Sequence, residues 1–259
     1  MKEACFSAKD IDALLSSMGK GDILVGGQAL AFWTGYYDIQ FKLPATVPAI
    51  TMDGDILGTR SSARRIASAM GGRVTPAPKD SITILVAQVT IGLGKDSFLN
   101  VDIIDRINGL TNEEIRKRAL PVERGQQSFR VMHPLDVLVS RVRNILSIPS
   151  KQDEKGHLQL LLSVLVARRF IKDIARKDQV LAVKAANMVF NEFREHGGKI
   201  LDRWGVDLFD AIPLDDLELP AFVEHQRNRM LAAHDKLVAG APETSARRIR
   251  TIHKQTSRR

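Results

Sequence analysis

Apolar residues follow two different patterns in the two halves of the chain. Before residue 134, short runs rich in β-branched residues alternate with helix-like segments, and glycine, proline and polar residues separate them. From Pro134 onward, apolar residues recur every three or four positions, which is the period of one face of an α-helix. The pattern predicts an α+β chain in which a mixed β-sheet with flanking helices precedes a C-terminal helical bundle.

Capping and turn residues set the bounds of the predicted elements. Ser7 and the Thr111-x-x-Glu114 spacing are N-terminal capping signals for helices. The predicted strands are residues 22–25, 49–57, 81–91, 98–105 and 127–132, the third and fourth being antiparallel neighbours. Helices are predicted after Ser7, from residue 29, at 61–70, after Thr111, and at 135–146, 158–174, 180–193, 200–204 and 220–238.

The same pattern divides the chain into domains. Residues 1–147 are expected to form the α/β domain, residues 148–240 a helical domain, and residues 241–259 a basic, flexible tail. Residues 38–49 contain two prolines and show no clear period, so they are predicted to be an inserted loop.

Charge and cysteine content narrow the environment and the partners. The net charge of +8 favours polyanionic partners such as RNA, and residues 246–259 carry five Arg and one Lys with no carboxylate. The single cysteine, Cys5, allows no internal disulfide and fits a reducing compartment. No apolar run is long enough to span a membrane and the start lacks the apolar core of a signal peptide, so a cytoplasmic protein without a membrane partner is expected.

Three aspartates on two predicted strands carry the strongest chemical signal. Side chains alternate between the faces of a strand, so Asp53 and Asp55 point to one face while Gly54 points to the other. On the later strand Asp102 shares a face with Asn100. Carboxylates held this close raise each other's pKa unless a cation neutralises them, and hard oxygen ligands select Mg²⁺ or Mn²⁺. The aspartates are therefore the predicted metal ligands, and a metal-bound nucleoside triphosphate (NTP) is the expected occupant.

A glycine pair precedes the aspartates at a strand-to-helix turn. Because Gly26 and Gly27 lack a Cβ, their backbone N–H groups can approach phosphate oxygens at a helix N-terminus, where the helix dipole favours negative charge. The same pair also suits tight packing of a strand against a helix without any ligand. The aspartates that follow favour the phosphate-binding interpretation.

The order of these motifs resembles a known family. The polymerase-β-type nucleotidyltransferases carry a glycine pair, then an Asp-x-Asp strand, then an Asp on a later strand. The segments VGGQALAFW, TMDGDILG and NVDIIDRINGL are similar to those of small bacterial members, among them the AbiEii-like toxins of toxin–antitoxin and phage-defence systems. The resemblance covers residues 20–147, about half of the chain.

The resemblance implies a reaction and a set of roles. An NMP would move from an NTP to a hydroxyl of RNA, tRNA included, or of protein. Asp53 and Asp55 would bind both metal ions, and Asp102 would bind the metal that activates the attacking hydroxyl. Two metal ions stabilise the attacking and departing oxygens in such a transfer. The resemblance also implies a toxin or phage-defence role and an antitoxin protein as a partner.

The resemblance assigns the triphosphate to a second group of residues. Gly26, Gly27 and Gln28 would hold the phosphates. On the predicted helix at 135–146, Arg141 is favoured over Arg143 to reach the nucleotide, with a surface ion pair as the alternative for Arg141.

Three departures from the family pattern favour an alternative function. The interval from Gly27 to Asp53 is long at 26 positions, Gly54 stands where a bulky apolar residue is usual, and Arg141 and Arg143 stand in a region where the toxin-like members carry Lys. The alternative is a catalytically silent module of the same fold that binds a nucleotide or nucleic acid.

Overall fold

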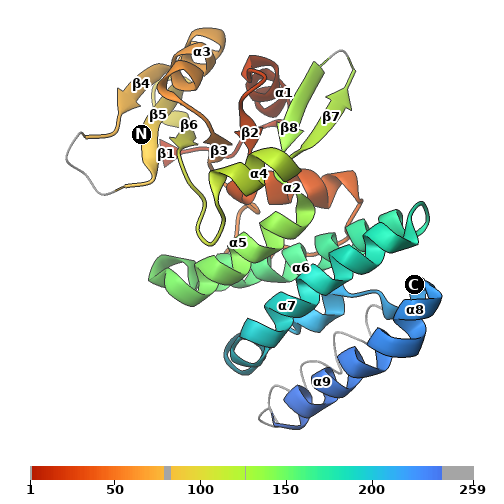
Figure 1. Cartoon of the computed structure of the whole chain (residues 1–259). Helices are drawn as coiled ribbons and strands as arrows, with labels where there is room; N and C mark the ends of the chain where they lie inside the picture. Colours follow the sequence, from red (N-terminus) through yellow and green to blue (C-terminus); the bar gives the residue numbers. More distant parts are fainter. Residues whose placement is uncertain (1, 79–82, 126, 241–259) are drawn as a thin grey trace. The chain divides into compact units, whose positions relative to one another are not determined.

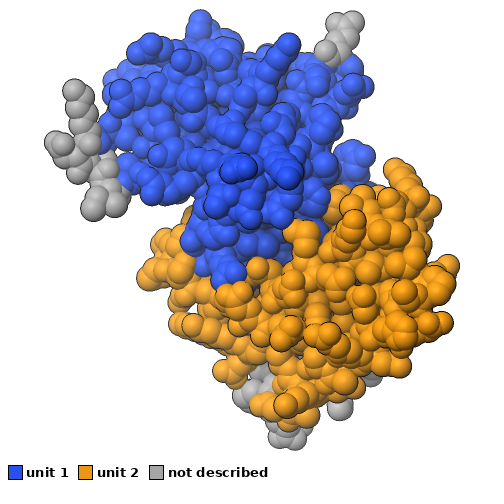
Figure 2. All heavy atoms as spheres, viewed as in Figure 1, with its two compact units in different colours: residues 1–143 blue, residues 144–259 orange. Residues whose placement is uncertain are grey.

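The chain folds into two compact units, as seen in a computed structural model that describes residues 2–78, 83–125 and 127–240 (Figure 1). One unit is residues 1–143 and the other is residues 144–259, coloured separately in Figure 2. The division falls inside a helix, four residues before the predicted domain end at residue 147. The α+β class, the mixed sheet with flanking helices and the helical C-terminal region are confirmed. The predicted tail at 241–259 lies outside the described residues.

The first unit is built on an eight-stranded mixed sheet with the order β4-β5-β6-β3-β2-β8-β7, and β1 pairs with β6 beside this path. All five predicted strands are present, and the predicted antiparallel pair is β5 with β6. The strands are β1 (Lys2–Glu3), β2 (Ile23–Leu24), β3 (Gly54–Leu57), β4 (Arg73–Pro76), β5 (Leu85–Gly92), β6 (Ser97–Ile104), β7 (Leu120–Arg124) and β8 (Gln127–Val131).

Strand β3 is much shorter than the predicted strand at 49–57, and the pairing of β6 explains the difference. The first residue of β3, Gly54, pairs with Val101, while Lys2 and Glu3 of β1 pair with β6 further upstream. Because β1 occupies that stretch of the β6 edge, the residues before Gly54 have no free edge to pair with there. Asp53 therefore lies in a bend just before the strand.

Five helices accompany this sheet: α1 (Ala8–Ser17), α2 (Gly26–Tyr36), α3 (Arg60–Met70), α4 (Asn112–Arg118) and α5 (Pro134–Ser147). The predicted caps at Ser7 and Thr111 are confirmed, each with a complete capping box. Helix α3 is capped by Thr59, with Ser62 completing its box. Helix α1 packs closely over Gly54, since a Cβ there would lie 3.0 Å from Leu14 Cδ2. Glycine at this position therefore allows the close approach of a helix to the sheet.

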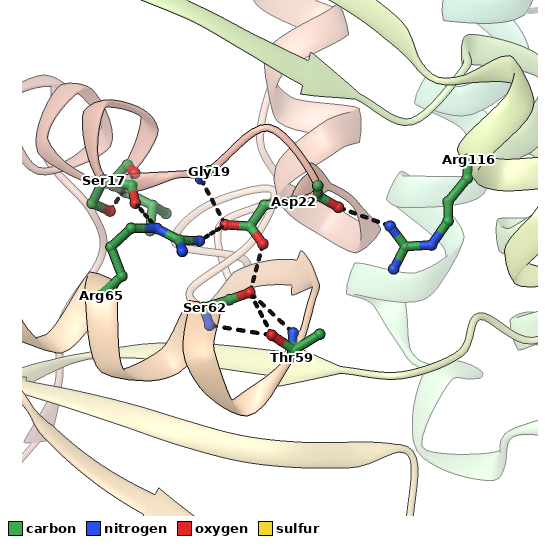
Figure 3. Close-up of polar contacts among 9 residues, drawn as sticks. Ser17, Gly19, Asp22, Thr59, Ser62, Arg65 and Arg116 are labelled. Atoms are coloured by element: carbon green, nitrogen blue, oxygen red, sulfur yellow. Dashed lines mark hydrogen bonds and ion pairs between the residues drawn. The ribbon is translucent and has the colours of Figure 1, made fainter.

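A buried carboxylate ties together the start of β2, the end of α1 and the start of α3 (Figure 3). Asp22 is 4% exposed, and its Oδ1 accepts a hydrogen bond of 2.6 Å from Ser62 Oγ. Its Oδ2 accepts from the Gly19 N–H at 2.8 Å and forms an ion pair with Arg65. The Arg65 Nε also donates to Ser17 O at 2.9 Å. The charge of Asp22 is thus fully compensated, and three elements of the unit are held in place around it.

Removing this carboxylate should destabilise the unit. Asp22→Ala is expected to lower the free energy of unfolding by about 3 kcal/mol, because buried, charge-assisted hydrogen bonds are lost. Asp12→Ala is the matched control: Asp12 pairs with Arg124 at 3.0 Å, but both side chains are about half exposed, at 47% and 51%. The control should change stability by less than about 1 kcal/mol. Urea unfolding followed by circular dichroism measures both, and equal losses would contradict the prediction.

The second unit is helical within its described residues. It contains α6 (Glu154–Ala175), α7 (Gln179–Trp204), α8 (Pro220–Phe222) and α9 (Asn228–Ala239), short 3₁₀ turns at Pro149–Lys151, Leu208–Ala211 and Leu214–Asp216, and a π-helical turn at Val223–Arg227. The helices predicted at 180–193 and 200–204 are one continuous helix, α7. Among the described residues of both units, no helix is long and apolar enough to cross a membrane.

A histidine–aspartate pair connects α9 to the segment that follows α7. His234 Nε2 lies 2.7 Å from Asp207 Oδ2, and the His234 ring stacks on Phe209 with 4.4 Å between centroids. The other oxygen of the buried Asp207 accepts from the Phe209 N–H. The hydrogen bond to Asp207 raises the pKa of His234, with smaller contributions from the charges of Asp207, Asp235 and Asp210, and burial opposes the shift. The charged form of the histidine is therefore favoured in the folded state.

The stabilisation by His234 should depend on pH. A raised folded-state pKa gives a contribution that is complete below the ordinary histidine value of 6.5 and is lost as pH rises through the folded value. His234→Gln should therefore destabilise the protein more at about pH 5.5 than at about pH 8.5. Urea unfolding at both values measures the difference. His225→Gln is the control, because His225 is 75% exposed beside Glu224, and its effect should be small at both values. An effect of His234→Gln that grows with pH would overturn the assignment.

Candidate functional site

Two of the three predicted aspartates lie side by side on one face of the sheet. Strands β3 and β6 run parallel, and Asp55 pairs in register with Asp102. Residues in register on neighbouring strands share a face, and such strands are about 4.8 Å apart. Val101 and Ile103, which flank Asp102 on its strand, are completely buried, whereas Asp102 itself is partly exposed. The predicted alternation on the later strand is therefore confirmed, and Asp102 does not point into the core.

Two carboxamide groups hold the Asp102 carboxylate. Gln88 Nε2 donates to Asp102 Oδ1 at 3.1 Å, and Asn100 Nδ2 donates to the same oxygen at 3.0 Å. Gln88 belongs to β5 and pairs in register with Asp102, so both lie on one face. Sequence reasoning placed Asn100 beside Asp102 but missed Gln88. The signal was present in the alternation of β5, where Gln88 is polar between buried Ala87 and Val89.

Asp53 is near the other two aspartates but is positioned differently. It lies in the bend before β3, is partly buried, and accepts a hydrogen bond from Thr51 Oγ1 to its backbone carbonyl oxygen at 3.3 Å. Its charge contributes to the raised pKa of Asp55, which places it within electrostatic range. The prediction that strand alternation alone aligns Asp53 with Asp55 is wrong, because Asp53 is not in the strand.

The glycine pair holds Asp55 in this structure. Gly27 N–H donates to Asp55 Oδ2 at 3.0 Å, and both glycines are buried. Gly26 has a positive φ of 62°, and a Cβ on it would lie 2.2 Å from Asp55 Oδ2. Only glycine therefore leaves room for the carboxylate. The prediction that the N–H groups of both glycines face a phosphate differs from this arrangement, since the Gly27 N–H is already bonded to Asp55.

Arg141 supplies positive charge to the same site. It lies in α5, is 8% exposed, and its charge opposes the rise in the pKa of Asp55. The pKa of Asp55 is raised to about 6, chiefly by burial; the charges of Asp53 and Asp102 add to the rise, and the Gly27 hydrogen bond opposes it. Burial in turn lowers the pKa of Arg141, and the charge of Asp55 raises it. The alternative of a surface ion pair for Arg141 is therefore wrong.

The other two candidates from the sequence are placed by contacts elsewhere in the first unit. Arg143 packs its side chain against Gly109, where a Cβ would lie 2.4 Å from Arg143 Cγ. Gln28, on α2, is 8% exposed and lines a large cavity. The preference for Arg141 over Arg143 as the nucleotide contact stays a prediction.

The donor set fits a hard cation in chemistry and only partly in arrangement. Asp55 and Asp102 offer carboxylate oxygens in register on one face, which suits Mg²⁺ or Mn²⁺. However, within residues 2–78, 83–125 and 127–240, no three His, Cys, Asp or Glu side chains are arranged so that they could hold a metal ion. One oxygen of each carboxylate is engaged by protein donors. The pair thus has the oxygen chemistry that a hard cation prefers, and the predicted three-aspartate set is not assembled among the described residues.

Comparison with known proteins adds no relative to this geometry. No family model, curated protein or solved structure matches the chain. The function is therefore argued from the residues of the site and from the motifs themselves.

Replacing Gly26 should disturb the site and the fold together. Gly26→Ala is expected to lower the free energy of unfolding by at least about 2 kcal/mol, because alanine is strained at positive φ and its Cβ overlaps the Asp55 carboxylate. Gly35→Ala, on the same helix, is the control: a Cβ there meets nothing within 4 Å, and it should leave stability unchanged or raise it by about 0.5 kcal/mol. Urea unfolding measures both. Equal effects of the two changes would show that Gly26 has no special role.

Proposed function

We propose that the chain is a metal-dependent nucleotidyltransferase that moves an NMP from an NTP to a hydroxyl group. The single observation that carries the proposal is the in-register pair of Asp55 and Asp102, on parallel neighbouring strands beside the glycine turn. Two carboxylates on one sheet face suit a cation that carries a phosphate chain. The order of the glycine, Asp-x-Asp and Asp motifs supports the same reaction class.

The proposed reaction is an in-line substitution at the α-phosphorus. The oxygen of the acceptor hydroxyl forms a bond to the α-phosphorus, and the bond from this phosphorus to the oxygen that bridges to the β-phosphorus breaks. Pyrophosphate leaves with that electron pair, and the carboxylate of Asp102 accepts the hydroxyl proton. Gln88 and Asn100 fix the carboxylate by their hydrogen bonds to Oδ1, which keeps its orientation constant.

The other polar groups of the site bind and balance charge. Mg²⁺ or Mn²⁺ held by Asp55 and Asp102, with Asp53 close by, would neutralise charge on the phosphates and make the acceptor hydroxyl more acidic. Arg141 provides a permanent positive charge near Asp55, which suits binding of a polyphosphate. Gly26 leaves the room that the Asp55 carboxylate itself occupies.

The acceptor is proposed to be RNA rather than protein. The net charge of +8 favours a polyanion, because Lys and Arg release counterions from phosphates on binding. Transfer to protein is an outcome of the test below. The toxin role and the antitoxin partner stay predictions from the family resemblance.

A second candidate function is supported by the same contacts. The Gly27 N–H occupies one oxygen of Asp55, and the charge of Arg141 acts on the same carboxylate. A site whose charge is compensated within the protein needs no cation to be stable. Such a site would suit a module that binds a nucleotide or nucleic acid without turnover.

Transfer of label from an α-labelled NTP distinguishes the transferase from the silent binding module. The parent, Asp102→Asn and Asp105→Asn are each incubated with Mg²⁺, every α-labelled NTP in turn, and total cellular RNA. We expect the parent to label RNA and release pyrophosphate, and Asp102→Asn to lose at least about 100-fold in rate, the typical contribution of a general base. Asp105→Asn is the matched control, because Asp105 is about half exposed at 48%, pairs with Arg106, and should retain activity.

The outcomes assign each function separately. Labelled protein instead of RNA would change the acceptor and keep the reaction. Absence of label and of pyrophosphate in the parent, together with Mn²⁺ binding that Asp55→Asn abolishes in an electron paramagnetic resonance titration, would support the silent module. Absence of both transfer and Mn²⁺ binding would refute the metal site itself, and transfer that persists in Asp102→Asn would refute the role of Asp102.

A further inference from the structure

A large cavity in the first unit is separate from the carboxylate pair. Its volume is about 700 Å³, within the range of small-molecule sites. Its walls come from the N-terminal segment, from α2, from the segment between α2 and β3 that includes the inserted loop, and from β7, and they include the rings of Phe6, Phe32 and Tyr36 with Pro48 and Ile50. The segment between α2 and β3 thus forms one wall of a cavity large enough for a ring system.

A glutamine carboxamide lines this cavity. Gln28 is 8% exposed as a whole residue, and its side chain makes no hydrogen bond within the described part of the chain. Its polar atoms are not among the fully buried side-chain atoms that lack a partner, so the carboxamide is open to the cavity and can bond to a molecule there. The carboxamide offers two N–H donors and one carbonyl acceptor at a single position. It is therefore suited to a ligand edge that carries both a donor and an acceptor.

The rest of the lining selects against charged ligands. The charged residues on the lining are Glu123 and Arg124, and Arg124 forms an ion pair with Asp12 at 3.0 Å. The remaining walls are mainly apolar and aromatic, which suits the faces of a flat ring. A phosphate group would meet Glu123 and a mostly apolar surface there. The expected ligand is an uncharged planar ring.

We propose that this cavity binds a nucleobase, with the Gln28 carboxamide hydrogen-bonded to the edge of the base. The choice of a nucleobase over other planar heterocycles rests on the proposed nucleotidyltransferase function. Two local connections favour a link to the carboxylates. Gln28 directly follows Gly27, which binds Asp55, and Thr51 on the cavity wall donates to the backbone of Asp53. Base recognition is thus assigned to the inserted loop and α2, and phosphate chemistry to the sheet.

Nucleosides without phosphates test the cavity directly. Trp33 on α2 is the reporter, in the full chain carrying Trp204→Phe so that one tryptophan remains. Adenosine, guanosine, cytidine and uridine are titrated separately, and we expect saturable binding of at least one. Gln28→Leu keeps a similar size and removes the hydrogen bonds, so it should weaken that binding at least about tenfold. Gln40→Leu is the matched control, because Gln40 is an exposed loop residue that bonds Asp38 and does not line the cavity.

A second variant keeps the test decisive if Gln28→Leu does not fold. Ala31 lines the cavity, and Ala31→Leu narrows it while Gln28 is kept. Circular dichroism checks the fold of each variant. Binding that Ala31→Leu weakens while Gln40→Leu does not supports the cavity. No binding by the parent, or equal binding by the parent and both cavity variants, overturns the proposal. Binding of indole that is as tight as that of any nucleoside, and insensitive to Gln28→Leu, overturns the assignment to a nucleobase.

The same titration separates this proposal from the proposed function. Asp102→Asn should keep nucleoside binding, since Asp102 does not line the cavity. Nucleoside binding without transfer by the parent would reject the transferase and keep the cavity assignment. Transfer by the parent without nucleoside binding would reject the cavity assignment and keep the transferase.

Discussion

Two carboxylates side by side on a sheet face repel each other, and the surroundings of Asp55 and Asp102 compensate for that repulsion. The parallel pairing of β3 with β6 causes this repulsion, because it brings the side chains of Asp55 and Asp102 into register. Hydrogen bonds to both carboxylates and the charge of Arg141 reduce it. The pKa of Asp55 is nevertheless raised to about 6, chiefly because the carboxyl group is buried and only in smaller part because of the neighbouring carboxylates. A bound cation would favour the charged form of such a carboxyl group.

Structural hydrogen bonds and an ion pair, with no proposed role in the reaction, hold the backbone around Asp55 and Asp102. The Val25 N–H donates to the carbonyl oxygen of Asp55 at 2.9 Å, which joins the end of β2 to the centre of β3. At the other end of β2, Asp22 binds the beginnings of α3 and β2 together. The strand that carries the glycine turn is therefore anchored at both ends. A site of this kind needs such anchoring, because small displacements of a carboxylate change its fit to a cation.

Local signals in the sequence were sufficient for some of these features. Alternation predicted that Asp102 faces away from the core, and capping residues predicted the starts of α1 and α4, because both depend on neighbours within a few positions. Contacts between distant segments were not predictable in the same way. The shortness of β3 follows from pairing between Lys2–Glu3 and β6, and the partner of the Gly27 N–H is 28 positions away. Strand β7 was missed because it contains a proline, which is tolerated at the edge position it occupies in the sheet.

The cavity offers a physical reason for the long interval between the glycine pair and the aspartates. A shorter connection could join α2 to β3 directly, yet the chain uses the additional residues to build an apolar wall facing Gln28. The Gln28 carboxamide is open to this cavity and makes no hydrogen bond within the described part of the chain. The segment between α2 and β3 therefore borders a space that has a hydrogen-bonding group among mainly apolar walls. Such an arrangement is typical of binding sites, where a few polar groups are directed at a ligand rather than at the protein.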